Sequence, residues 1–322
     1  MAGIDEAQAS PPPAPPRETA LQARPDRAAP AVTPARSARQ GLPMAGRTCV
    51  VTGASSGIGR AACLALARLG ASVVLVCRDR SRGDAALAEV RGAAADGEPA
   101  LELADLASLA QVRDLAARLA GLPRIDVLVN NAGLVLGTRQ VTADGLEHTF
   151  ALNHLAPFLL TSLLRPRLVA SAPARVVTVA STAHRGARLD LADLQLERRY
   201  LPMLAYANSK LANILFTREL ARRLAGTGVT ANCLHPGTVR TNFGRTGSPA
   251  LRLGLAIAGP FLRSAESGAR TLVYLASSTE VAGRSGGYYV SCRPRTPSRA
   301  ARDDDLARRL WRLSAELTGL PG

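Results

Sequence analysis

The sequence is poor in aromatic residues and has almost no lysine. Aromatic side chains make up 3% of the 322 residues, and Lys210 is the only lysine among 40 basic residues. Proteins that bind single-stranded nucleic acid place aromatic side chains along basic grooves. Here the arginines are scattered along ordinary helical patterns, so we expect no nucleic-acid partner despite a formal net charge of +15.

Cysteine, histidine and long apolar runs are scarce as well. The five cysteines form no C-x-x-C pair and the four histidines no H-x-x-x-H pattern, so no metal site is predicted. Cys49, Cys77 and Cys233 lie in apolar runs, which is typical of buried thiols in a reducing compartment, and we expect a cytoplasmic protein. No apolar run reaches the roughly 18 residues of a membrane span, and no secretory signal is recognisable.

The chain divides into a tail and one large domain. Residues 1–44 are rich in Pro, Ala and Arg and have few large apolar side chains, so we expect them to be disordered. From residue 45 to residue 322 the composition is that of a globular protein, and no second domain boundary is visible. We therefore expect a single catalytic domain over residues 45–322.

Short apolar strands alternate with helical patterns throughout this domain. Such alternation indicates βαβ units and a parallel sheet covered on both faces. The predicted fold is a single-domain α/β Rossmann fold, a doubly wound parallel sheet with helices on both faces. The expected strands are 47–52, 72–77, 100–103, 125–130, 175–180 and 229–234, and the expected helices are 58–69, 85–91, 109–119, 145–164 and 206–224.

A glycine-rich turn joins the first strand to the first helix. In T-G-A-S-S-G-I-G, Gly53 permits a sharp turn, Gly57 lets the backbone approach a diphosphate, and Gly59 allows close helix packing. The N-terminus of the helix favours an anion at the same place. We predict cofactor contacts from Gly53, Ser55, Ser56, Gly57, Ile58 and Gly59.

The ends of the second and third strands carry the cofactor selectivity. Arg78 follows the second strand, and a guanidinium there would pair with a 2′-phosphate, with Arg60 adding charge. Asp79 would favour NAD if it turned inward. We predict NADP (NADPH), with NAD as the alternative. Asp105 and Leu106 are expected at the adenine edge, although Asp105 can equally belong to a helix cap.

Tyr206 and Lys210 are spaced to lie on one face of a helix. A free phenol has a pKa near ~10 and is a poor acid-base catalyst at neutral pH. A neighbouring ammonium favours the phenolate, so Lys210 is expected to lower the pKa of Tyr206. Because this spacing also occurs by chance, the catalytic interpretation of the pair depends on support from the other motifs.

Taken in order, these motifs resemble the short-chain dehydrogenase/reductase family. The resemblance covers about residues 46–320, and several segments look like the retinol dehydrogenase branch of that family. The family motifs are Thr52–Gly59, Asn130-Asn131-Ala132-Gly133, Ser181 and Tyr206–Lys210, and the branch segments are residues 179–184, 209–216, 235–242 and 307–311.

The resemblance implies a role for each matching residue. Tyr206 would be the proton donor or acceptor, Lys210 would lower its pKa and hold the nicotinamide ribose, and Ser181 would bind the substrate oxygen. Asn153 would hold a water that links Lys210 to a proton relay, or else cap backbone in its helix. Residues expected to border the cofactor are Asn130, Ala132, Gly133, Pro236, Gly237, Val239 and Thr241. His154 and His184 are expected to be structural or to line the substrate site.

Residues 243–267 form an apolar segment that in this family covers the substrate. Three interpretations remain open: a lid over a lipophilic substrate, a helix packed on the core or a partner subunit, and a surface helix in peripheral contact with a membrane. Many branch members begin with a membrane-anchoring helix, where this chain has its Pro-rich tail.

The sequence therefore predicts an NADP(H)-dependent oxidoreductase that interconverts a lipophilic aldehyde or ketone and its alcohol. One alternative is a non-catalytic NADP-binding sensor or scaffold, and another is a reductase of ring double bonds resembling protochlorophyllide reductase. The resemblance is also compatible with a homodimer or homotetramer that pairs through the Tyr206 helix.

Overall fold

A computed structural model describes residues 1–2, 41–237 and 264–321 of the chain. The predicted disordered tail lies almost wholly outside these ranges, as do most of the predicted lid and the cofactor candidates Val239 and Thr241. Met44, placed in the tail by composition, is buried, and its main-chain N–H donates to the carbonyl of Leu69 at 2.9 Å. The folded domain therefore includes residues just before the predicted boundary.

The centre of the domain is an eight-stranded sheet in the order β3-β2-β1-β4-β5-β6-β7-β8. Neighbouring strands pair in parallel except β7 and β8, which are antiparallel. The strands are β1 (Thr48–Thr52), β2 (Ser72–Cys77), β3 (Ala100–Leu103), β4 (Val127–Asn130), β5 (Ala174–Val179), β6 (Val229–His235), β7 (Tyr288–Val290) and β8 (Arg293–Pro294). β1 and β4 are adjacent in space although β2 and β3 intervene in the chain, so the strand order reverses between them.

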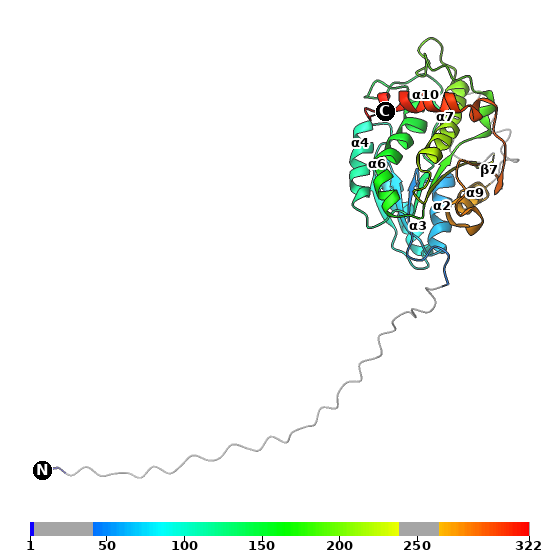
Figure 1. The fold of residues 1–322 in the computed structure, drawn as a ribbon. Helices are drawn as coiled ribbons and strands as arrows, with labels where there is room; N and C mark the ends of the chain where they lie inside the picture. Colours follow the sequence, from blue (N-terminus) through cyan, green and yellow to red (C-terminus); the bar gives the residue numbers. More distant parts are fainter. Residues whose placement is uncertain (3–40, 238–263, 322) are drawn as a thin grey trace. The chain divides into compact units, whose positions relative to one another are not determined.

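Helices cover both faces of this sheet (Figure 1). One face packs against α4, α6, α7 and α10, and the other against α2, α3 and α9. The helices are α2 (Gly57–Arg68), α3 (Arg80–Ala93), α4 (Leu109–Ala120), α5 (His148–Phe150), α6 (Ala156–Ala170), α7 (Pro202–Arg223), α9 (Ala265–Ser277) and α10 (Asp304–Leu317). A π-helical turn, η1 (Ala151–Leu155), joins α5 to α6, and short 3₁₀ turns are η2 (Thr182–Gly186), η4 (Thr279–Val281) and η5 (Ala300–Arg302).

The β2 strand shows why the sheet is buried on both sides. Val73 and Leu75 belong to the apolar cluster on the α2, α3 and α9 face, whereas Val74 and Val76 belong to the cluster on the opposite face. A strand covered on both faces is typically apolar on both, and β2 is an unbroken apolar run from Val73 to Cys77. The predicted fold class is confirmed.

The catalytic-helix candidate α7 is longer than predicted and is covered by the C-terminal helix. It begins at Pro202, four residues before Tyr206, and Pro is well suited to the first turn of a helix. Trp311 of α10 packs against Phe158 of α6 and Phe216 of α7, with ring centroids 4.8 and 5.8 Å away. The α7 helix therefore uses part of its surface for contacts within the chain.

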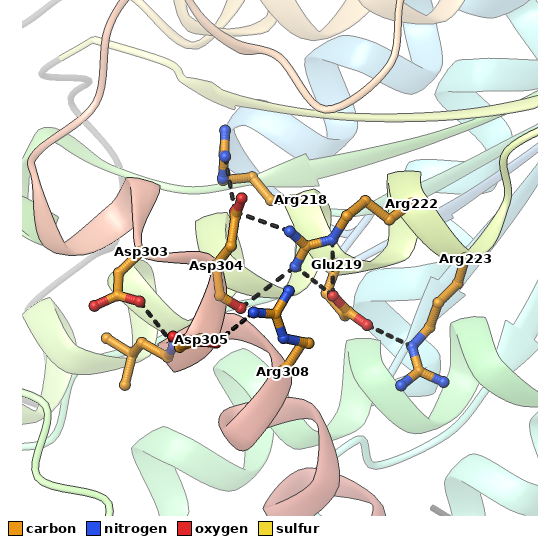
Figure 2. A network of polar contacts seen from close by, with 9 residues as sticks. Arg218, Glu219, Arg222, Arg223, Asp303, Asp304, Asp305 and Arg308 are labelled. Atoms are coloured by element: carbon orange, nitrogen blue, oxygen red, sulfur yellow. Dashed lines mark hydrogen bonds and ion pairs between the residues drawn. The ribbon is translucent and has the colours of Figure 1, made fainter.

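Ion pairs connect the same two helices (Figure 2). The buried carboxylate of Glu219 accepts hydrogen bonds from Arg222 and Arg223 on α7. Arg222 also pairs with Asp304 of α10 at 2.9 Å, and the guanidinium of Arg223 lies 4.4 Å from the Trp311 ring centroid. These contacts fix the C-terminal helix against the helix that carries Tyr206 and Lys210.

Candidate active site

The polar candidates gather where the carboxyl ends of the parallel strands meet. Asn130 ends β4, Ser181 follows β5 by one intervening residue, and the glycine turn follows β1. In open α/β sheets, ligands bind at this edge, at the point where the strand order reverses. That point lies between β1 and β4.

The glycine turn has the backbone geometry that its sequence predicts. Gly53 and Gly57 have φ values of +66° and +55°, in the left-handed region that favours glycine. A Cβ on Gly59 would lie 2.3 Å from the carbonyl oxygen of Gly53, so only glycine fits there. Ser56 is the N-cap of α2, and its side chain makes no capping hydrogen bond. The first amides of α2 are therefore available to an anionic group.

Two side chains that sequence reasoning did not assign hold this turn in place. The Asn131 Nδ2 donates to the main-chain carbonyls of Thr52 and Gly53 at 2.8 and 3.3 Å. In return, the Thr52 hydroxyl accepts from the main-chain N–H groups of Asn131 and Ala132. The N-N-A-G motif was recognisable in the sequence. Its second asparagine, however, donates hydrogen bonds to a turn almost 80 residues earlier, which no local pattern predicts.

At the end of β2, Arg78 and Asp79 turn out to have different roles. The carboxylate of Asp79 accepts from the main-chain N–H of Arg82 at 2.8 Å and so caps α3. Arg78 is exposed, and no described residue forms an ion pair or hydrogen bond with its guanidinium. Arg60, the second basic candidate, pairs instead with Glu89 at 2.8 Å.

Asp105 and Leu106 lie between β3 and α4. Asp105 Oδ1 accepts from the main-chain N–H of Ala107 at 3.0 Å, while Ser108 caps α4. The carboxylate of Asp105 thus supports the turn that leads into α4. Leu106 is buried, and it borders a narrow gap too small to admit a water molecule, together with Thr52, Asn130, Ala132, Ala156, Pro157 and Leu160.

The side-chain amide of Asn130 is incompletely satisfied. Its Nδ2 donates to the Thr161 hydroxyl at 3.0 Å, and its buried Oδ1 has no hydrogen-bond partner among the described residues. A buried polar atom without a partner is costly in a finished core and is common at ligand sites. Asn130 ends β4 at the same edge of the sheet as the glycine turn, and that turn fits the diphosphate of a dinucleotide.

Tyr206, Ser181 and Lys210 come together as predicted. The Tyr206 phenol is hydrogen-bonded to Ser181, and the Lys210 Nζ lies 5.6 Å from the centroid of the Tyr206 ring. The ammonium donates to the main-chain carbonyl of Val179 at 3.0 Å. The Ser181 oxygen also accepts from the Ala183 main-chain N–H at 3.2 Å.

The expected direction of the Tyr206 pKa is wrong for the protein alone. Burial raises the pKa of Tyr206 to about 12, and the hydrogen bond with Ser181 opposes this rise only in part. Burial also lowers the pKa of Lys210 to about 8. The ammonium of Lys210 donates to the Val179 carbonyl and lies 5.6 Å from the Tyr206 ring centroid, and burial dominates the shift in the Tyr206 pKa.

Asn153 lies in the π-helical turn and is completely buried. Its Nδ2 donates to the carbonyl of Leu134 and to the Ser209 hydroxyl, and its Oδ1 accepts from the Leu134 main-chain N–H at 2.8 Å. A Cβ built on Gly133 would lie 3.3 Å from Asn153 Oδ1 and 3.4 Å from Lys210 Nζ. Asn153 therefore fixes the loop after β4 next to Lys210.

His184 anchors the backbone of Ser181. Its Nε2 accepts from the main-chain N–H of Ser298 at 3.1 Å, so the proton of the neutral ring is on Nδ1. The Nδ1–H then donates to the Ser181 carbonyl at 2.6 Å. Burial lowers the pKa of His184, which is consistent with a neutral ring and a structural role.

The remaining candidates lie after β6. Pro236 and Gly237 are half-buried there, and Gly237 has a φ of +89°. The structure gives no placement for Val239 and Thr241, which lie outside the described residues. Within the described ranges, no group of three His, Cys, Asp or Glu side chains is arranged to hold a metal. No helix in the described part of the chain is both long and apolar enough to span a membrane.

A glycine turn at the switch point of a parallel sheet, with a tyrosine and a buried lysine beside it, defines a nicotinamide-dependent oxidoreductase. The family model for short chain dehydrogenases matches residues 47–250. Human retinol dehydrogenase 13 is 43% identical over 85% of each chain, and human retinol dehydrogenase 14 is 44% identical over 86% of this chain and 88% of its own. The chain belongs to the short-chain dehydrogenase family and is an alcohol/carbonyl oxidoreductase similar to retinol dehydrogenases.

Solved structures agree with this assignment. The crystal structure of an uncharacterised protein from Mycobacterium paratuberculosis is 38% identical, with a TM-score of 0.71, over 88% of this chain and 97% of that chain. The RhlG/NADP active-site complex of Pseudomonas aeruginosa is 28% identical, with a TM-score of 0.62, over 77% of this chain and 95% of that chain. The family binds a nicotinamide cofactor, and the glycine turn described above fits one.

Proposed function

We propose that this protein uses NADP(H) to interconvert a lipophilic aldehyde or ketone and its alcohol, with Tyr206 as the proton donor and acceptor. The observation that carries the proposal is the hydrogen bond between Tyr206 and Ser181 above the buried ammonium of Lys210. This grouping places an acid, an O–H donor and a fixed cation within one site. A proton-transfer centre needs these three elements.

The division of labour follows from the contacts. A bound nicotinamide supplies or accepts the hydride. In reduction, Ser181 would donate its O–H to the substrate oxygen while Tyr206 gives that oxygen a proton. Lys210, a cation at neutral pH, would stabilise the phenolate that Tyr206 becomes. Asn153 and Gly133 would keep the loop after β4 in register with this centre.

The preference for NADP rests on the end of β2. Asp79 is the residue that would favour NAD, but its carboxylate caps α3. Arg78 is exposed at the end of the strand, where a guanidinium suits a 2′-phosphate. The bound NADP of the RhlG complex is a property of that protein, and it supports the same choice here.

The substrate class rests on similarity and on the predicted lid. The relatives named retinol dehydrogenases suggest a long, apolar aldehyde or alcohol of the retinoid type. Residues 243–263, which would cover the substrate, are rich in Leu, Ile and Phe. We also propose a reducing compartment such as the cytoplasm, supported by five free thiols, of which four are buried.

Cofactor oxidation against a panel of carbonyl compounds tests the proposal. Purified protein is mixed with NADPH or NADH and with retinal, a medium-chain aldehyde, a steroid ketone, a quinone or protochlorophyllide. We expect NADPH to be consumed with retinal or another lipophilic aldehyde, and more slowly with NADH. Turnover of protochlorophyllide alone would favour ring reduction. Tight NADPH binding without any turnover would favour a non-catalytic sensor.

A further inference from the structure

A chain of buried polar side chains leads from the C-terminal helix to the catalytic lysine. Ser314 of α10, His154 of the π-helical turn and Asn213 of α7 are all at most 2% exposed. The Ser314 hydroxyl lies 2.9 Å from His154 Nε2, and His154 Nδ1 lies 3.3 Å from Asn213 Oδ1. Asn213 Nδ2 then donates to the carbonyls of Asn153 at 2.9 Å and Val179 at 3.3 Å.

The direction of every hydrogen bond in this chain is fixed by chemistry. Carbonyl oxygens accept only, so the Asn213 amide must point its Nδ2 toward them and its Oδ1 toward His154. His154 must therefore carry its proton on Nδ1, and its Nε2 accepts from the Ser314 hydroxyl. Burial lowers the pKa of His154 to about 4, so the ring stays neutral and keeps this arrangement across the working pH range.

The chain ends on the carbonyl that also anchors Lys210. Val179 O accepts from Lys210 Nζ at 3.0 Å and from Asn213 Nδ2 at 3.3 Å. Asn213 Nδ2 also donates to the main-chain carbonyl of Asn153, so the same amide group links the carbonyls of Asn153 and Val179. An ammonium has three donors and turns toward any acceptor within reach. Because Asn213 and Lys210 share the Val179 carbonyl, that oxygen bonds the ammonium less strongly than it would if Lys210 were its only donor.

We propose that Asn213 is a positioning residue for Lys210: it shares the Val179 carbonyl with the ammonium and so limits how strongly that carbonyl holds the cation beside Tyr206. His154 and Ser314 act one step further away, because they fix the orientation of the Asn213 amide. The C-terminal helix thereby contributes to the geometry of the active site without touching a substrate. This inference rests on the proposed function only for its kinetic consequence.

Few other charges face Lys210. Tyr206 faces Lys210 from the same helix. The two histidines of this region are His184, a neutral ring on the η2 turn, and His154 on the π-helical turn. Among the interactions of the described residues, no carboxylate contributes to the pKa of Lys210, which burial alone lowers. A substitution at Asn213 should therefore change the titration midpoint of Lys210 directly.

The single lysine of the sequence makes that titration accessible. Lysine labelled with ¹³C at Cε gives one protein resonance, from Lys210, whose chemical shift follows protonation of the amine. In Asn213→Leu, the Val179 carbonyl loses its amide donor and binds the ammonium more strongly. We expect the Lys210 midpoint to rise by about one pH unit. The pH profile of kcat/KM for alcohol oxidation should move to higher pH, because the cation no longer favours the Tyr206 phenolate.

Two further variants separate positioning from loss of stability. Asn232 is an equally buried asparagine whose amide bridges Arg284 and Gly287, so Asn232→Leu should lower the melting temperature and leave the Lys210 midpoint unchanged. Ser314→Ala, a smaller change, should shift the midpoint in the same direction as Asn213→Leu but less. It also serves as the test if Asn213→Leu does not fold.

The NMR titration does not depend on turnover, so it judges this inference even if the proposed activity fails. An unchanged Lys210 midpoint in Asn213→Leu and Ser314→Ala, accompanied only by lower melting temperatures, would overturn it. In that case the polar chain would be a structural element of the core.

Discussion

The ammonium of Lys210 lies over the ring of Tyr206, 5.6 Å from its centroid, and both groups are perturbed by burial in opposite directions. The pKa of Tyr206 is raised to about 12, and that of Lys210 is lowered to about 8. Each shift disfavours the charged form of its group. The site thus holds a phenol that ionises only at high pH beside a cation that burial destabilises. The buried cation lowers the stability of the fold at a position that the proposed function requires.

Replacing Lys210 should therefore stabilise the fold. Its pKa in the folded protein is below the ordinary value of 10.5, so the unfolded chain binds more protons between pH 8 and 10.5. The destabilisation is present in full below about pH 8 and is relieved as the pH rises through that window. We expect Lys210→Met to gain on the order of 1–3 kcal/mol at pH 7 and less at pH 10.

Thermal unfolding at pH 7 and pH 10 measures this effect, with Arg91→Met as a control for the loss of an exposed basic residue. Lys210→Met should also lose turnover. An unchanged or lower melting temperature of Lys210→Met at pH 7 would show that the ammonium is stabilised by its surroundings.

The glycine turn allows a second test with a matched control. In Gly59→Ala the new methyl group would lie 2.3 Å from the Gly53 carbonyl and 2.5 Å from Asn131 Nδ2, so the turn must move. We expect NADPH affinity, measured by fluorescence titration, to fall at least tenfold. Gly92→Ala meets no atom within 4 Å and lies in α3, so it should leave affinity unchanged and stabilise by about 0.5–1 kcal/mol. Equal affinities in both variants would argue against diphosphate binding at this turn.

Cofactor selectivity is expected to depend on Arg78. In Arg78→Ala the KM for NADPH should rise about tenfold, while the KM for NADH changes little, because only NADPH carries the 2′-phosphate. Arg91→Ala removes an exposed charge from the far end of α3 and serves as the control. If Arg78→Ala raises both KM values equally, Arg78 acts through general attraction and not through the 2′-phosphate.

The ion pairs of Glu219 should stabilise the packing of α10 on α7. The arginines that hold this buried carboxylate are about a third exposed, which weakens each pair, so Glu219→Gln should cost only about 1–2 kcal/mol. Burial acts to raise the pKa of Glu219, but Arg222 and Arg223 outweigh it and hold the pKa below its usual range. This contribution is therefore present above the ordinary carboxylate pKa and is lost as the pH falls through the folded value.

Urea unfolding at pH 7 and pH 3.5 measures the difference in free energy of unfolding between wild type and Glu219→Gln. The gap in unfolding free energy should narrow at the lower pH. A gap of the same size at both values would mean that packing, and not charge, accounts for the loss.

The sheet was predictable because its strands are buried on both faces. Ser72–Cys77 and Ala100–Leu103 were predicted with the bounds that the structure shows. In Ser72–Cys77, the unbroken apolar run from Val73 to Cys77 leaves few other interpretations. The C-terminal part was harder. β7 has three residues and β8 has two, too short for any periodicity, and the α10 helix alternates arginine with leucine in a pattern that was used only as a family signature.

At the site, residue identities were predictable but their energetics were not. The spacing of Tyr206 and Lys210 predicted that they would lie together, and they do. It could not show how deeply both are buried, so the predicted direction of the Tyr206 pKa was wrong. Asn131 and Asn213 act through contacts with residues 79 and 60 positions away, which no local pattern contains.

The central claim is that Tyr206 transfers the proton, and a single-turnover experiment tests it most directly. Wild type, Tyr206→Phe and the control Tyr274→Phe are each saturated with NADPH and mixed with retinal. The Tyr274 hydroxyl bonds Glu280 and takes no part in the proposed proton transfer. We expect equal NADPH affinity in all three proteins and a loss of about 10³-fold in the rate of NADPH oxidation in Tyr206→Phe alone. Retention of the wild-type rate in Tyr206→Phe would contradict the account.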